Sequence, residues 1–221
     1  SDRGMSLTTI AGLENATQAL NGAVVGPAEI TAGLGFDPLA VLTAAERAAI
    51  ATVPFAADVL DAARADGSFL VLRVPRTPTG ALTMLTLATH LQPGFDPKVH
   101  QGVGYSLRGE WTIDDQPFAT ADTCVAEWRL VRRMVDPRTI NQVYRAQDER
   151  LALLPAVAGV AARRSAIEIA YDTLLWHRTT GERLLTDAWD WSRSPSTDQG
   201  FAALGEFSER GLRVIAYSRA V

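Results

Sequence analysis

The residues best suited to chemistry lie near the C-terminal end of the chain, in the segments Trp176-His177-Arg178 and Trp189-Asp190-Trp191-Ser192-Arg193. Tryptophan rings offer flat apolar area for sugars or bases, and imidazole, carboxylate and guanidinium groups supply polar contacts. These segments predict a ligand groove between a helix end and a strand. The alternative, which we favour, is that the tryptophans fill the space between helix and sheet. The predicted groove residues are Trp176, His177, Trp189, Asp190, Trp191 and Arg193.

Strand geometry constrains this prediction. Side chains alternate between the two faces of a strand, so Trp189 and Trp191 share one face and Asp190 lies on the other. Asp190 can join both tryptophans only if a bulge turns its side chain.

The search for catalytic and metal-binding patterns identifies no catalytic residue and predicts no metal or cofactor. His90 and His100, with Asp96 between them, could bind a metal, although two surface histidines are the favoured interpretation. Cys124, the single cysteine, has no histidine close in sequence and is predicted to be a buried structural thiol. The segment 102–109 lacks the spacing of a phosphate-binding loop and is expected to be a loop or hairpin.

The composition indicates a folded, water-soluble chain. It has 221 residues, of which 47% are hydrophobic and 21% charged, with a net charge of −4. The longest apolar run, about 152–162, contains Pro155 and would span only about 17 Å as a helix, so we expect no membrane partner. Lys98 is the only lysine, which suggests a GC-rich bacterial source, and the lone cysteine fits a cytoplasmic location.

The chain is expected to form one globular domain, residues 5–221, after residues 1–4, which we interpret as a leftover from expression. The charge changes sign along the chain, with net −7 through Trp128 and net +3 from Arg129 onward. This asymmetry raises the alternative of two lobes, 5–123 and 124–221.

Hydrophobic periodicity and turn signals predict an α+β fold. Helices are expected in the N-terminal and central parts, two strands near the centre, and an antiparallel meander at the C-terminal end. Residues 23–35 are expected to be a loop with a short strand. The expected helices are 7–21, a short one from Thr43 to before Pro54, 55–66, 79–91, 136–151 and 160–178; the expected strands are 68–74, 125–134, 189–194, 201–207 and 212–218.

A series of short segments in a fixed order resembles a family of uncharacterised bacterial proteins. The matching segments are Pro54-Phe55, Val59-Leu60, Phe69–Val71, Trp128–Arg133, Gln147, Thr180–Leu184, Gly205–Phe207 and Gly211–Val214. The resemblance implies a single folded unit. It implies no catalytic residue, because the family has no assigned activity.

Three function classes remain after these observations. The favoured one is a non-catalytic protein-interaction or assembly protein, acting as a homo-oligomer or with another protein. The second is a hydrolase-like enzyme for a small anionic or sugar ligand, with a site assembled from dispersed residues. The third and least favoured is weak nucleic-acid binding through the arginines between Arg129 and Arg164, for which ion-paired surface positions are the simpler explanation.

Overall fold

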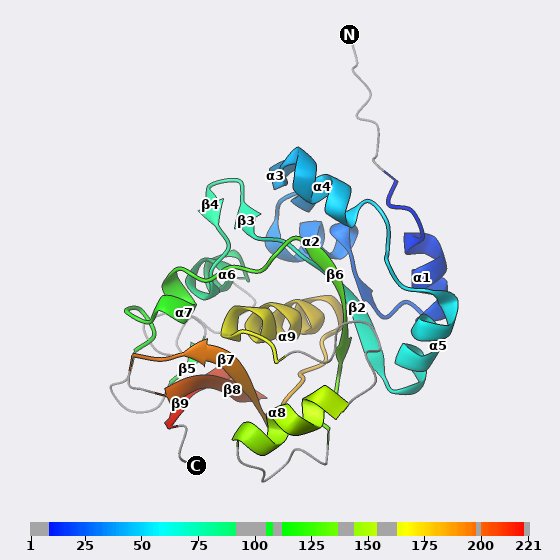
Figure 1. The fold of residues 1–221 in the computed structure, drawn as a ribbon. Coiled ribbons are helices and arrows are strands. Elements are labelled where there is room, and N and C mark those ends of the chain that lie inside the picture. Colours follow the sequence, from blue (N-terminus) through cyan, green and yellow to red (C-terminus); the bar gives the residue numbers. More distant parts are fainter. Residues whose placement is uncertain are drawn as a thin grey trace.

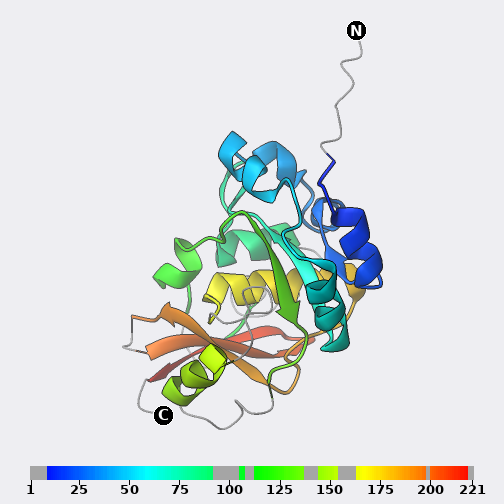
Figure 2. The ribbon, with the colours of Figure 1, turned by 45° about the vertical axis from the view of Figure 1, so that its right-hand side comes forward.

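The structure, a computed structural model, describes residues 9–91, 105–107, 112–136, 144–153, 163–197 and 200–218. Its centre is helix α9 (Ala166–Thr180), which lies between an N-terminal and a C-terminal sheet (Figures 1 and 2). Eleven consecutive positions of α9, from Ala166 to Trp176, are buried, because the helix packs against both sheets. The α+β class and the C-terminal antiparallel meander are therefore confirmed.

The N-terminal sheet has the strand order β1-β2-β6. Strand β1 (Val24–Val25) is parallel to β2 (Ser68–Arg73), and β6 (Glu127–Arg132) is antiparallel to β2. All six positions of β2 are buried, since helices α5 (Ala57–Ala65) and α9 both pack on it. This explains why the sequence of β2 is an apolar run without alternation.

The remaining N-terminal elements pack on this sheet, on α9 or on one another. They are α1 (Leu13–Ala19), α2 (Pro27–Leu34), α3 (Pro38–Val41), α4 (Ala44–Ile50), the hairpin β3 (Arg76–Thr77) and β4 (Gly80–Ala81), and α6 (Met84–Leu91). The capping box predicted at Thr43 and Glu46 is present, with the Thr43 hydroxyl accepting from the Glu46 N–H at 3.2 Å.

The C-terminal sheet has the order β5-β9-β8-β7. It contains β5 (Tyr105–Ser106), β7 (Trp189–Pro195), β8 (Gly200–Ser208) and β9 (Gly211–Ser218). One face packs on α9, and α8 (Tyr144–Leu153) lies on the opposite side of the sheet (Figure 1). The short helix α7 (Pro117–Thr120) packs against α6 and α9.

The structure corrects three of the expected elements. Residues 27–34, expected to be a loop, form α2, because Pro27 opens the helix and the Glu29 side chain accepts the Gly26 N–H at 2.9 Å. Helix α6 begins at Met84, since Gly80–Ala81 belongs to a hairpin. Helix α9 begins at Ala166, where Ser165 provides an N-cap that the apolar periodicity does not reveal.

Both sheets combine strands from the two halves of the chain. Strand β2 pairs with β6 across residue 123, and β5 pairs with β9 across the same position. In the described part of the chain, no helix combines the length and apolar character needed to cross a bilayer.

Candidate functional site

A cluster of ion pairs surrounds the N-terminal end of α9. Ser165 caps the helix: its hydroxyl accepts the Glu168 N–H at 3.3 Å, while the Glu168 carboxylate accepts the Ser165 N–H at 2.7 Å. This exchange fixes Glu168 at the first turn, and Asp172 follows one turn later on the same side of the helix. Two carboxylates are thereby held toward the N-terminal sheet.

Asp172 is the centre of the cluster, and its side chain is 0% exposed. Arg73, at the end of β2, donates to it twice, from Nε at 3.0 Å and from Nη2 at 2.7 Å. Arg164 donates a third hydrogen bond from Nη1 at 2.7 Å. Two guanidinium groups therefore share one buried carboxylate, the arrangement that offsets desolvation best.

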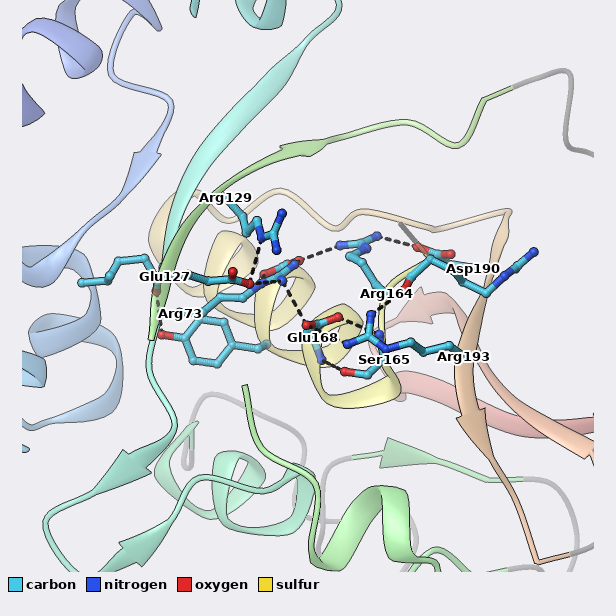
Figure 3. Close-up of polar contacts among 12 residues, drawn as sticks. Arg73, Glu127, Arg129, Arg164, Ser165, Glu168, Asp190 and Arg193 are labelled. Carbon is cyan, nitrogen blue, oxygen red and sulfur yellow. Dashed lines mark hydrogen bonds and ion pairs between the residues drawn. The ribbon is translucent and has the colours of Figure 1, made fainter. Parts of the chain in front are cut away.

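The cluster extends from Arg73 to Glu127 and Arg129 in one direction and from Arg164 to Asp190 in the other (Figure 3). Arg164 also pairs with Asp190 of β7, and Arg193 pairs with Glu168 at 3.2 Å. Arg73 also contacts Glu127 at 3.2 Å and Glu168 at 3.4 Å. We call the whole set the interior network; it comprises Arg73, Arg129, Arg164, Arg193, Glu127, Glu168, Asp172 and Asp190.

The charges of the interior network balance. Burial by itself lowers the pKa of Arg73, but the charge of Asp172 and its hydrogen bonds outweigh burial and raise that pKa. Arg73 therefore stays charged in the interior. Four guanidinium groups face four carboxylates, so the network has no excess charge of either sign. The arrangement is suited to holding β2, β6, α9 and β7 in fixed relative positions.

Cys124 lies close to this network and is 2% exposed. Burial, partly offset by the charge of Arg73, raises the pKa of its thiol. A protonated, buried thiol is a poor nucleophile. The predicted burial of Cys124 is confirmed.

The second notable feature is the face of the C-terminal sheet that points away from α9, which we call the outer face. Trp191 of β7 pairs with Ala203 of β8, which in turn pairs with Ile215 of β9. In the same way, Trp189 pairs with Gly205, and Gly205 pairs with Arg213. Phe201 and Tyr217 form a further pair on the same face. The outer face thus comprises Trp189, Trp191, Phe201, Ala203, Gly205, Arg213, Ile215 and Tyr217.

Small residues on the middle strand of the outer face allow large rings from the flanking strands to meet. Tyr217 of β9 stacks on Trp191 of β7, with ring centroids 5.1 Å apart, although Ala203 of β8 separates the two strands. Tyr144 of α8 extends the layer, with its ring centroid 4.6 Å from that of Phe201. The rings of this layer contact one another, and their residues are half-buried.

Cations lie at both ends of this aromatic layer. The Arg163 guanidinium is 3.8 Å from the centroid of Tyr144, and the Arg213 guanidinium is 5.7 Å from the centroid of a Trp189 ring. Each arginine also has a carboxylate partner: Arg163 pairs with Asp148, and Arg213 pairs with Glu206. The outer face therefore carries no net charge from these pairs.

The six residues predicted to line the groove divide among four places. Trp189 and Trp191 belong to the outer face, whereas Asp190 and Arg193 join the interior network. Trp176 is 4% exposed, stacks on Phe69 and donates to Glu182. His177 is half-buried, with its ring 5.0 Å from that of Phe207. The described contacts of Trp176 and of the two strand tryptophans share no residue.

The remaining predictions concern the arginines near the end of β6, a metal site and the segment 102–109. Arg129, Arg132 and Arg133 pair with Glu127, Asp66 and Glu182, so these arginines contact three different elements. Across the described ranges, no group of three histidine, cysteine or acidic side chains could hold a metal ion. His100 and Asp96 lie outside the described residues, as does most of the segment 102–109.

Sequence reasoning did not connect Asp190 and Arg193 with the rest of the interior network, and it missed three of the five aromatic residues of the layer. One signal was available: Glu168 and Asp172 stand four residues apart in an otherwise apolar helix, and Arg73 ends an apolar strand. Such charges inside apolar segments indicate buried pairing. The partnership of Tyr217, Tyr144 and Phe201 depends on tertiary structure and leaves no local signal.

Comparisons of this chain with protein-family models, with curated proteins and with solved structures found no match.

Proposed function

We propose that this protein is a non-catalytic interaction protein that assembles with a second copy of itself through the outer face of its C-terminal sheet. The observation that carries the proposal is the half-exposed aromatic layer formed by Trp189, Trp191, Phe201 and Tyr217. Tryptophan and tyrosine are the residues most enriched at the centres of protein interfaces.

The way the rings are arranged supports a protein partner over a flat small ligand. The ring centroid of Trp191 lies 5.1 Å from that of Tyr217 and 5.7 Å from that of Tyr144. Neighbouring rings therefore occupy the surfaces on which a sugar or base would stack. The partly exposed rings and the side chain of Ile215 offer apolar area beside α8 that a partner can cover.

Charge balance supports a second copy as that partner. A strongly basic or acidic partner would find no excess charge to meet on the outer face, because Arg213 and Glu206 neutralise each other. In a two-fold assembly the same patch meets itself, and a patch that carries both signs can satisfy that geometry. We further propose a bacterial, cytoplasmic setting, supported by the single lysine and the lone buried cysteine.

An enzyme acting on a small anionic or sugar ligand is the alternative from another class, and the interior network would be its site. The pairing of four arginines with four carboxylates supports a positional role instead, because both oxygens of the buried Asp172 carboxylate already accept guanidinium N–H groups. Nucleic-acid binding receives little support from Arg129, Arg132 and Arg133, which are ion-paired.

The test is a measurement of mass by sedimentation equilibrium over a concentration series. We expect a dimer at high micromolar concentration, and an Ile215→Asp variant should weaken association by about tenfold or more, because a carboxylate would be buried without a partner. The matched control is Met134→Asp, since Met134 is 77% exposed and lies outside the outer face. A wild-type chain that stays monomeric throughout would contradict the proposal, as would equal effects of the two variants.

A further inference from the structure

A strained segment lies beside one end of the outer face. Leu185 and Glu206 are non-glycine residues in the left-handed region, with φ of 56° and 43°. They lie on adjoining segments: the Phe207 N–H donates to the Leu185 carbonyl, and the Glu206 N–H donates to the Ala188 carbonyl, both at 3.2 Å. Backbone strain of this kind persists only where the surroundings enforce it, and it gathers at switches and binding sites. We call residues 182–188 together with 205–207 the junction.

The junction holds the two segments at very short range. A β carbon added at Gly205 would lie 2.1 Å from the Ala188 carbonyl oxygen. The register of β8 and β9 also shifts between Gly205 and Ser208, where the strand bulges. The two segments therefore have no free space in which to absorb a small change in the packing around the bulge.

Phe207 is the buried aromatic side chain of the junction. Basic groups lie beside its ring. The His177 ring contacts Phe207 edge-on at 5.0 Å, and the Arg183 guanidinium lies 5.7 Å from the Phe207 centroid. Arg183 Nε is buried without a hydrogen-bond partner among the described residues. An imidazolium at His177 would bring a second positive charge next to the Arg183 guanidinium, and their repulsion would disturb the Phe207 ring that both groups contact.

The charged groups around His177 offer little compensation for that second cation. Arg178 follows it on α9, and Arg183 faces it from the junction. The nearby carboxylates are engaged elsewhere, because Glu182 accepts from Trp176 and pairs with Arg133, and Glu206 pairs with Arg213.

The same bulge connects His177 to the outer face. Glu206 sits next to Phe207 in the bulge, its carboxylate pairs with Arg213, and Arg213 covers a Trp189 ring at 5.7 Å. A displacement of Phe207 would therefore move Glu206 and release Arg213 from Trp189.

We propose that the junction is a pH-sensitive switch, in which protonation of His177 displaces Phe207 and disorders the Arg213–Trp189 end of the outer face. The link to assembly rests on the proposed function, whereas the local opening does not. Acidification would then weaken the contact between two copies.

The titration of His177 has the sign that this switch requires. Burial lowers the pKa of His177, and the charges of Arg183 and Arg178 lower it further, against backbone hydrogen bonds at Gly181 and Glu182 that raise it. The folded protein therefore favours neutral His177. The stabilisation is fully present above pH 6.5, the ordinary pKa of histidine, and is lost as the pH falls below it.

The experiment measures amide exchange and mass on the full chain at pH 7.5 and 5.5. After correction for intrinsic rates, the Glu206 and Phe207 amides of the wild type should lose protection severalfold at pH 5.5, and the dimer should dissociate more readily. His177→Gln, which stays neutral, should abolish both effects. His90→Gln is the matched control and should retain them, because His90 contacts Phe36 and the Leu34 carbonyl, away from the junction.

The outcomes separate the two proposals. A wild type that is monomeric at both pH values contradicts the assembly, while exchange at Glu206 and Phe207 still reports on the switch. Unchanged protection in the wild type, or an unchanged pH effect in His177→Gln, overturns the switch whatever the mass. If His177→Gln does not fold, an NMR titration of the His177 Cε1 proton decides, and a pKa at or above 6.5 overturns the switch.

Discussion

Asp172 is the single residue whose loss should disturb the interior most. Its side chain is fully buried and accepts three hydrogen bonds from two guanidinium groups, those of Arg73 and Arg164. Neither arginine can reach bulk water easily, since the Arg73 and Arg164 side chains are 4% and 22% exposed. Removing the negative charge would leave two cations close together in the interior.

We therefore predict that Asp172→Asn lowers the free energy of unfolding by about 3–5 kcal/mol, the range observed when one member of a buried ion pair is removed. Urea denaturation followed by circular dichroism measures this change. Glu149→Gln is the control, because Glu149 pairs with Arg145 at the surface, where both side chains are mostly exposed. The control should change stability by less than about 1 kcal/mol. Equal effects of the two substitutions would show that the interior network is not held by its charges.

At the scale of secondary structure, two glycines occupy contrasting sites. Gly205 in β8 has no room for a side chain, because its added β carbon would meet the Ala188 backbone. Gly33 lies inside α2, where an added β carbon would come to 3.2 Å from Cγ of the flexible Arg178 side chain. Backbone atoms of a paired strand cannot yield, whereas a long side chain can.

We predict that Gly205→Ala destabilises the protein by about 1–3 kcal/mol or more through overpacking. Gly33→Ala should change stability by less than about 1 kcal/mol, because the gain in helix propensity offsets the small displacement of Arg178. Thermal unfolding of the two variants beside the wild type measures the contrast. A Gly205→Ala variant as stable as Gly33→Ala would mean that β7 and β8 do not approach as closely as the structure has them.

The type of most elements could be predicted from the sequence where the apolar pattern was regular and glycine or proline marked its ends. Strand β2 and the C-terminal meander followed from apolar runs that end at glycine or proline. Helix α2 was missed because Gly26-Pro27 and Gly33-Leu34-Gly35 read as turns, although Pro27 opens the helix and Gly35 ends it with a φ of 80°. Local signals alone could not distinguish these two uses of glycine and proline.

Residue roles at the candidate site were harder to predict than the elements. Strand alternation correctly separated Asp190 from Trp189 and Trp191, because it needs only the period of two. The partners of those residues come from distant parts of the chain: Arg164 for Asp190, and Tyr217 for Trp191. Such pairings depend on the sheet order β9-β8-β7 and on the small size of Ala203, which no local pattern encodes.

For the whole molecule, the exchange of strands between the two halves of the chain determines how it should unfold. Helix α9 packs on both sheets, and the interior network joins β2 and β6 to β7. A cut at residue 123 would separate β2 from β6 and β5 from β9. Neither half keeps a complete sheet without the other.

We accordingly predict one cooperative unfolding transition. Near-ultraviolet circular dichroism, which reports on tryptophan packing, and far-ultraviolet circular dichroism, which reports on the backbone, should give coincident curves in urea. A fragment of residues 5–123 should remain unfolded on its own. Two separated transitions, or a folded fragment, would instead indicate independent lobes.

The pairing of Arg73 with Asp172 also bears on the time at which the fold can be completed in the cell. These residues are separated by 99 positions. At ribosomal rates of about 5–20 residues per second, the strand that carries Arg73 emerges about 5–20 s before the helix that neutralises it. Throughout that interval the apolar residues 69–72 lack α9, and until β6 has been made they lack β6 as well. The nascent chain therefore passes through a period in which an apolar segment that is fully buried in the folded protein is exposed to solvent.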